Sequence, residues 1–195
     1  MVVCLVPSAD GLHAFGGSRW RVSARSDSGG VRPYEIATVD LRDPAVGLGL
    51  LGVSGFPLLA HLQVVRSEAW VQRYRIVGDD AVEWLEGDCR SGEELVPFPL
   101  DRPLPPLRLA AVQSAGDAEL FGGERFVRIG GKPVSVGAAV SYACVCGKPA
   151  TLVAQVGYGD WKLSTGTYSF YPGEQAERFY WCAVCEVVGV VTDAA

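Results

Sequence analysis

The chain has 195 residues, of which 49% are hydrophobic and 20% are charged, so it can bury a core as one domain or as two small ones. It carries 22 acidic and 17 basic residues, for a formal net charge of −5. The basic residues are spread among acids without a basic run, which argues against nucleic acid binding by phosphate neutralisation.

Short runs of β-branched, aromatic and aliphatic residues, separated by Gly, Pro, Asp and Ser, predict a chain dominated by antiparallel strands. Helical periodicity is nearly absent, and the best candidate for a helix is residues 107–115. The predicted class is therefore mostly β, with α+β at the margin. The predicted strands include residues 34–39, 58–65, 150–156, 167–171 and 186–191.

The apolar start of the chain, residues 1–6, lacks the basic region, long apolar stretch and small-residue cleavage site of a secretion signal. We therefore expect a cytoplasmic protein. Residues 45–65 carry no Asp, Glu, Lys or Arg, but their glycines and Pro57 would break a spanning helix. We expect no membrane segment.

The same stretch places Gly47, Gly49 and Gly52 at the G-x-G-x-x-G spacing of a dinucleotide-binding loop. Gly55 and Pro57 stand where the phosphate-binding helix should begin, so the context does not fit. The sequence favours a glycine-rich turn that leads into a buried strand.

An internal duplication is predicted when the chain is compared with itself at an offset of 92 residues. Residues 54–57 then lie over 146–149, and residues 60–64 lie over 152–156. Both copies continue into an aromatic strand. Self-similarity of this kind is typical of repeated structural units.

Five prolines between Pro97 and Pro106 exclude a helix or a central strand and predict an extended connector. The predicted organisation is a first, degenerate β-rich repeat at residues 1–96, a connector at 97–107 and a second β-rich repeat at 108–195.

Four of the six cysteines form two short pairs, Cys144 with Cys146 and Cys182 with Cys185. Zn²⁺ takes four thiolates in a tetrahedron, and two pairs on tight turns can supply them. Gly147 supports a turn after the first pair, because glycine takes left-handed backbone conformations cheaply. The spacing predicts a structural Zn²⁺ site in the second repeat, with disulfides and inert or redox-active thiols as the alternatives.

The other two cysteines stand apart. Cys4 lies inside an apolar run and is predicted to be a core residue. Cys89 falls near Cys185 when the repeats are superimposed, so it is either a remnant of a lost metal site or an ordinary thiol, and we favour the second interpretation.

Catalytic side chains are few, since only His13 and His61 can act as bases near neutral pH. We expect His13 on a surface loop and His61 in a buried strand, outside any catalytic motif. Acids cluster at residues 79–94, where a solvated hairpin rim is expected. Four thiolates would close the zinc shell without a water to activate. We therefore predict no catalytic residue.

The C-terminal half resembles a known family in a series of short motifs. These are GGKP at 130–133, CVCGKP at 144–149, LVAQV at 152–156, TYSFY at 167–171 and CAVC at 182–185. Their order is similar to that in the YwqG-type proteins of bacteria and the related programmed-cell-death-protein-2 type proteins of eukaryotes. The resemblance implies an internally duplicated, β-rich fold. It also implies a role as a chaperone of a ribosomal protein, as for eukaryotic members, or a link to toxin and immunity genes, as for some bacterial ones.

We therefore expect a non-enzymatic, zinc-stabilised module that binds a protein partner, as an immunity protein or a client chaperone. Its acidity suits a basic partner, such as a toxin acting on nucleic acid or a ribosomal-type client. The alternative is a hydrolase-like enzyme whose site lies among the acids of residues 79–94 or at His61. The sequence leaves the oligomeric state open.

Overall fold

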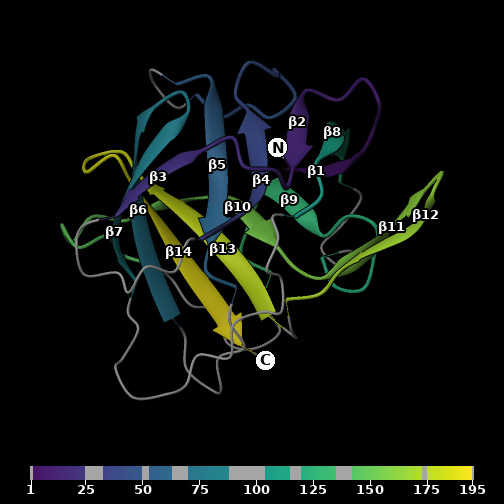
Figure 1. Cartoon of the computed structure of the whole chain (residues 1–195). Helices are drawn as coiled ribbons and strands as arrows, with labels where there is room; N and C mark the ends of the chain where they lie inside the picture. Colours follow the sequence, from purple (N-terminus) through teal and green to yellow (C-terminus); the bar gives the residue numbers. More distant parts are fainter. Residues whose placement is uncertain are drawn as a thin grey trace.

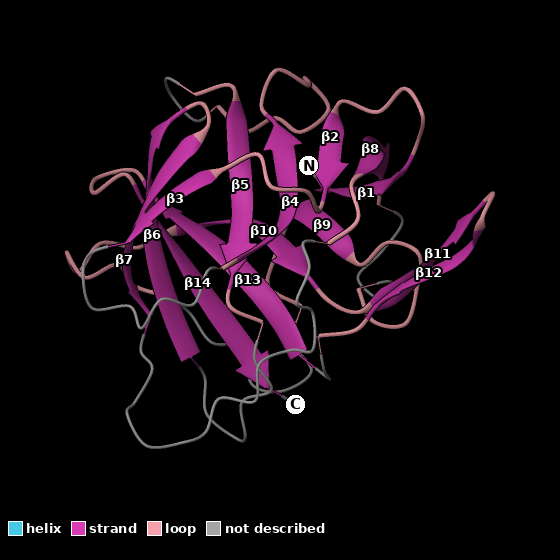
Figure 2. Ribbon diagram, in the orientation of Figure 1, coloured by secondary structure: helices cyan, strands magenta, loops and turns pink. Residues whose placement is uncertain are grey.

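The computed structural model describes residues 2–24, 33–49, 53–62, 70–87, 104–114, 120–134, 142–172 and 175–194. Within these ranges the chain forms strands, turns and loops but no helix (Figure 2). The prediction of a mostly β fold is confirmed. The described ranges also contain no helix with the length and apolar character that a membrane crossing requires.

Four predicted strands begin within one residue of an observed one, at residues 34, 151, 166 and 187. The strands in chain order are β1 (Val2–Pro7), β2 (His13–Phe15), β3 (Arg21–Ala24), β4 (Tyr34–Asp40), β5 (Gly55–Ala60), β6 (Trp70–Gly78), β7 (Ala81–Gly87), β8 (Leu107–Gln113), β9 (Val127–Gly130), β10 (Thr151–Val156), β11 (Gly159–Leu163), β12 (Gly166–Phe170), β13 (Gln175–Cys182) and β14 (Val187–Ala194).

One 12-stranded sheet dominates the described fold, in the order β3-β7-β6-β14-β13-β10-β9-β1-β8-β2-β4-β5. Neighbouring strands run antiparallel in every described pair except β3 with β7. β11 and β12 form a separate hairpin that extends to one side of the molecule (Figure 1).

Strands from both predicted repeats share this sheet. β6 pairs with β14, and β1 lies between β8 and β9. Tandem repeats are therefore not seen as separate units in the described sheet, and the division at residues 96 and 108 stays a prediction. Residues 97–103 of the predicted connector lie outside the described ranges.

The main core lies where the sheet curves back and brings β5 across β6 and β13 (Figure 1). The Tyr74 hydroxyl on β6 donates a hydrogen bond to the Pro57 carbonyl oxygen on β5. The rings of Phe56 on β5 and Trp181 on β13 meet edge to face, with centroids 6.3 Å apart. Burial of such large aromatic groups supplies much of the stability of a fold of this kind.

A second, smaller cluster lies on the opposite face of β13 and β14. Successive side chains of a strand point to opposite faces, so Phe179 enters the main core while Tyr180 and Cys182 enter the second cluster. Tyr142, Cys144 and Val191 complete the fully buried part of that cluster. Two of the four predicted zinc ligands are therefore packed on one face of the sheet.

The predicted helix at residues 107–115 is wrong, because residues 107–113 form strand β8. β8 pairs with β1 on one side, through Cys4 and Val112, and with β2 on the other, through His13 and Leu109. Helix propensity differs among ordinary residues by less than about 1 kcal/mol each. Pairing on both edges satisfies the backbone groups of β8 and outweighs that preference.

The strand predicted at residues 58–65 begins earlier, since β5 covers Gly55–Ala60. Pro57 cannot donate a ladder hydrogen bond, and the sheet tolerates it because β5 is the last strand in the described order. Residues 63–65 lie outside the described ranges, as do residues 50–52 of the glycine-rich motif.

Candidate metal centre

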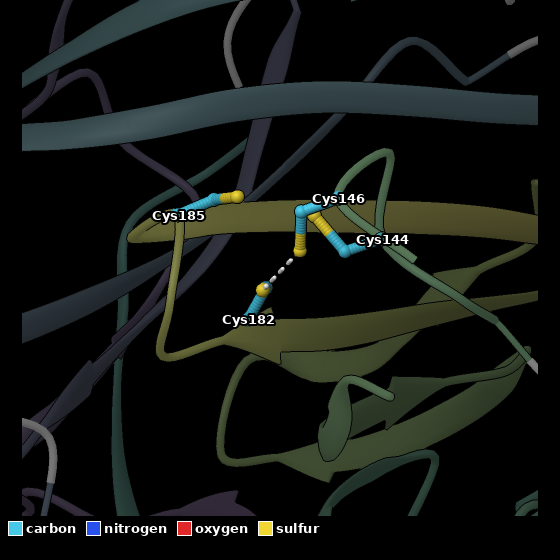
Figure 3. Close-up of side chains that lie close together, drawn as sticks. All are labelled: Cys144, Cys146, Cys182 and Cys185. Atoms are coloured by element: carbon cyan, nitrogen blue, oxygen red, sulfur yellow. Dashed lines mark hydrogen bonds between the residues drawn. The ribbon is translucent and has the colours of Figure 1, made fainter. Parts of the chain in front are cut away.

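The Sγ atoms of Cys144, Cys146, Cys182 and Cys185 all lie within 4.8 Å of one another. Figure 3 shows the four side chains converging from two segments of the chain. The Sγ atoms of Cys146 and Cys182 are 3.7 Å apart. The sequence pattern therefore identified four cysteines that the fold brings together.

A tight turn carries the first pair. The Gly147 N–H donates to the Cys144 carbonyl oxygen at 2.8 Å, and the Cys144 N–H donates to the Lys148 carbonyl oxygen at 3.0 Å. Gly147 has φ +74, a left-handed conformation that glycine adopts without steric cost. The sequence predicted a turn here with a backbone conformation that favours glycine, and the structure confirms it.

The hairpin between β13 and β14 carries the second pair. Cys182 is the last residue of β13 and lies opposite Val187, the first residue of β14. Cys185 lies in the turn between them, next to Glu186, which has φ 54. The strand register thus presents one buried cysteine at the end of a strand and one at the turn.

The spacing of the four sulfurs allows them to share one metal ion. A Zn–S distance of about 2.3 Å places the sulfurs of a tetrahedron about 3.8 Å apart, close to the 3.7 Å between Cys146 and Cys182. All four cysteines are free thiols in the structure, so they do not form the disulfides considered as an alternative. The four side chains are close enough to hold a metal ion.

Hydrogen bonds and crowding act on the thiols in opposite directions. The Lys148 N–H donates to Cys146 and lowers the pKa of that thiol to about 7. The neighbouring thiols of Cys146 and Cys144 raise the pKa of Cys185 to about 12. Burial raises the pKa of Cys144. Four thiols this close cannot all ionise easily by themselves, and a bound cation would remove that penalty.

Exposure differs strongly within the cluster. Cys144 and Cys182 are only 3% and 1% exposed, whereas Cys146 is exposed and Cys185 is partly exposed. The residues at the tips of the two turns are Val145 and Val184, each 69% exposed. The cluster therefore sits at the surface, with two of its four residues buried and two at least partly exposed.

His13 does not lie on a surface loop, and that prediction is wrong. It belongs to β2 and is 1% exposed. Its Nδ1 accepts the Asp40 N–H at 3.0 Å, so Nε2 carries the proton and donates to Asp43 Oδ2 at 3.0 Å. Burial lowers the pKa of His13. Since both ring nitrogens are engaged, this arrangement holds the 40–46 turn against β2 and leaves no nitrogen for a substrate.

His61 is buried, as predicted, and is 7% exposed, but it follows strand β5 and does not belong to it. Its ring meets that of Trp84 edge to face at 4.8 Å, and the Gln72 side chain brackets its backbone N–H and carbonyl. Burial lowers the pKa of His61 to about 4. The described contacts of His61 are those of a core side chain.

Two acids of the 79–94 cluster lie at an exposed hairpin rim, as expected, whereas Glu83 and Glu86 lie within strand β7. Asp79 and Asp80 form the exposed turn between β6 and β7. Asp79 accepts hydrogen bonds from the backbone and hydroxyl of Ser54, and Asp80 pairs with Arg21. Residues 88–94 lie outside the described ranges, among them Cys89. Cys4 is 1% exposed, as predicted for a core residue.

Sequence reasoning missed a group of buried polar side chains. Glu177 is 1% exposed and accepts a hydrogen bond from the Thr192 hydroxyl at 2.8 Å. Burial raises the pKa of Glu177 to about 7. Arg128 and Arg178 are also buried, on the strands that flank β10. Strand β13 mixes charged and aromatic residues on both faces, so no alternation in the sequence marks these positions as buried.

No family model matches the chain, and no curated protein or solved structure matches it either. The resemblance to YwqG-type proteins stays a prediction, and the site is interpreted from its own chemistry.

Proposed function

We propose that the protein is a zinc-stabilised, non-enzymatic module that binds a basic protein partner. The convergence of four free cysteines within 4.8 Å carries the zinc part of the proposal. Soft thiolate ligands in a tetrahedral set select Zn²⁺ over hard cations such as Mg²⁺ and Ca²⁺. Four protein ligands complete the coordination, so the metal would act as a structural clamp between two turns.

The exposed apolar tips of those turns support a binding role. Val145 and Val184 are the most exposed large hydrophobic residues in the described chain, and each stands beside a cysteine of the cluster. Zinc would fix both tips in one rigid surface. The net charge of −5 favours a basic partner. A toxin that acts on nucleic acid or a ribosomal-type client would both fit, as an immunity or a chaperone role requires.

The test is affinity capture of the tagged protein at native expression, with Val145→Asp and Val184→Asp compared with wild type. We expect a basic protein to be captured by the wild type and lost from both variants, while zinc content stays unchanged. Val77→Asp is the matched control, because Val77 is 55% exposed on β6. Capture of a toxin would favour the immunity role, and capture of a ribosomal protein would favour the chaperone role. Recovery of no partner would contradict both.

A further inference from the structure

Strand β6 reaches the cysteine cluster through two side chains. Arg73 on β6 donates from Nε to the hydroxyl of Tyr142 at 3.1 Å, and its guanidinium carbon lies 6.0 Å from the centre of the Tyr142 ring. Tyr142 stands two residues before Cys144 and shares a buried cluster with Cys144 and Cys182. Arg73, in the first half of the chain, therefore contacts Tyr142, the residue that leads into the metal-binding turn.

Packing fixes the position of the Tyr142 ring. Tyr142 is 8% exposed and lies 5.5 Å from the ring of Tyr180 on β13. Its other neighbour is Gly189 on β14, where an added Cβ would lie 2.2 Å from the Tyr142 Cζ atom. Gly189 leaves the space that the ring occupies. The ring is thus held between β13 and β14, and its hydroxyl is held by β6.

The strand register explains why Arg73 is the residue that makes this contact. Tyr180 pairs with Gly189, and Gly189 pairs with Arg73, so the three lie in one row across β13, β14 and β6. Two positions closer to the turn, the next row on the same face contains Cys182, Val187 and Arg75. Arg75 pairs with Glu83 at 3.1 Å. Of these two arginines, the described contact to Tyr142 is made by Arg73.

We propose that Tyr142 and Arg73 are positioning residues of the metal centre, which hold the Cys144–Cys146 turn in register with the β13–β14 turn. This inference rests on the proposed zinc site. Among the described residues, the two sides of the Cys144 turn pair through an isolated bridge between residues 143 and 149 and not through a strand ladder. Anchoring Tyr142 limits the positions that the first cysteine pair can adopt before metal binds. Groups that hydrogen-bond directly to metal ligands change metal affinity by about 10-fold to 100-fold in other sites, and Tyr142 and Arg73, one step further out, should act at the lower end of that range.

The test is zinc affinity, measured by competition with a chelator on the full chain, for Tyr142→Phe, Arg73→Gln and Arg73→Lys. Tyr142→Phe and Arg73→Gln should each weaken zinc binding by about 10-fold. Arg73→Lys keeps a donor and should recover most of that loss. Arg75→Gln, which removes the same charge from the same strand, should bind zinc as the wild type does.

Cobalt spectra separate positioning from loss of a ligand. We expect Co²⁺-loaded Tyr142→Phe to keep the absorption of a tetrahedral four-thiolate site, although it binds the ion more weakly. Affinities within twofold of wild type for both Tyr142→Phe and Arg73→Gln would overturn the inference. An equal loss in Arg75→Gln would also overturn it, because charge alone would then explain the effect. A wild type that binds no zinc would instead contradict the proposed function.

Discussion

The sulfur atoms of Cys146 and Cys182 lie 3.7 Å apart, although the two residues are 36 positions apart in the sequence. One comes from a tight turn before β10 and the other from the end of β13. Backbone hydrogen bonds close both turns, so neither turn depends on the contact between the two sulfurs. Together with Cys144 and Cys185, they are close enough to hold one metal ion.

The exposure of the four thiols predicts the order in which they react. In the zinc-loaded protein, N-ethylmaleimide should modify Cys146 first, because Cys146 is an exposed residue while Cys144 and Cys182 are buried. Zinc should be released in parallel. Peptide mass spectrometry at short times measures the order, and buried Cys4 is the internal control. Earlier modification of Cys144 or Cys182 than of Cys146 would contradict the described geometry.

The raised pKa of Glu177 predicts that the protein becomes less stable as the pH rises. Burial raises its pKa to about 7 in the folded protein, above the ordinary value of 4.5. Between these values the folded state keeps the proton that the unfolded state releases, so the free energy of unfolding decreases with pH, by about 3 kcal/mol in total. Glu177→Gln should lose this dependence and should be more stable than wild type at pH 8.

The lowered pKa of His61 predicts the opposite effect, a free energy of unfolding that rises with pH over nearly the same pH range. Burial lowers its pKa to about 4, so between pH 4 and 6.5 the unfolded state holds a proton that the folded state lacks. Stability through His61 therefore rises with pH. We expect the wild type to show a shallow net dependence, Glu177→Gln a rising one and His61→Phe a falling one. Urea unfolding from pH 4.5 to 8 measures this, and parallel curves for all three proteins would contradict it.

The backbone conformation of Glu186, in the turn between β13 and β14, predicts that a substitution there will stabilise the protein. Glu186 has φ 54, which is costly for a side chain with a Cβ atom. Glu186→Gly should raise the free energy of unfolding by about 1 kcal/mol, because glycine adopts this conformation freely. Glu186→Ala removes the same charge without relieving the backbone and serves as the control. Equal effects of the two changes in denaturant unfolding would refute the backbone explanation.

Gln155 on β10 predicts a loss of stability when its amide is removed. Its Oε1 accepts the Val134 N–H at 2.7 Å, and its Nε2 donates to the Lys132 carbonyl oxygen at 3.0 Å. Gln155→Met keeps the volume but loses both bonds, so we expect a cost of about 2 kcal/mol in unfolding experiments. Gln113→Met, at an exposed position on β8, should change stability by less than about 0.5 kcal/mol. Similar costs at both positions would count against this role.

Local patterns in the sequence predicted the strands well where β-branched and aromatic residues gather. Tyr34–Asp40 and Val187–Ala194 are examples. The four-cysteine cluster was also predictable, because metal ligands impose spacing on the sequence. Strand β8 was not, since its conformation depends on the strands beside it rather than on its own residues.

The burial of His13 and Glu177 depends on partners distant in the sequence, and no local pattern records them. His13 is held by Asp43, which lies 30 residues away. The pairing of β6 with β14 was also not predictable from local patterns, because it joins strands from opposite halves of the chain. Sequence comparison within the chain suggested two successive units, whereas the order of strands in a sheet is a tertiary property.

Elemental analysis of freshly purified protein, with Cys144→Ser and Cys182→Ser variants, tests the zinc centre most directly. The account predicts one zinc ion per chain in the wild type, lost in both variants together with a large part of the thermal stability, because metal binding and folding are coupled. Cys4→Ser, which alters a buried cysteine outside the cluster, should keep its zinc. Wild-type protein without zinc, or variants that retain it in full, would contradict the account.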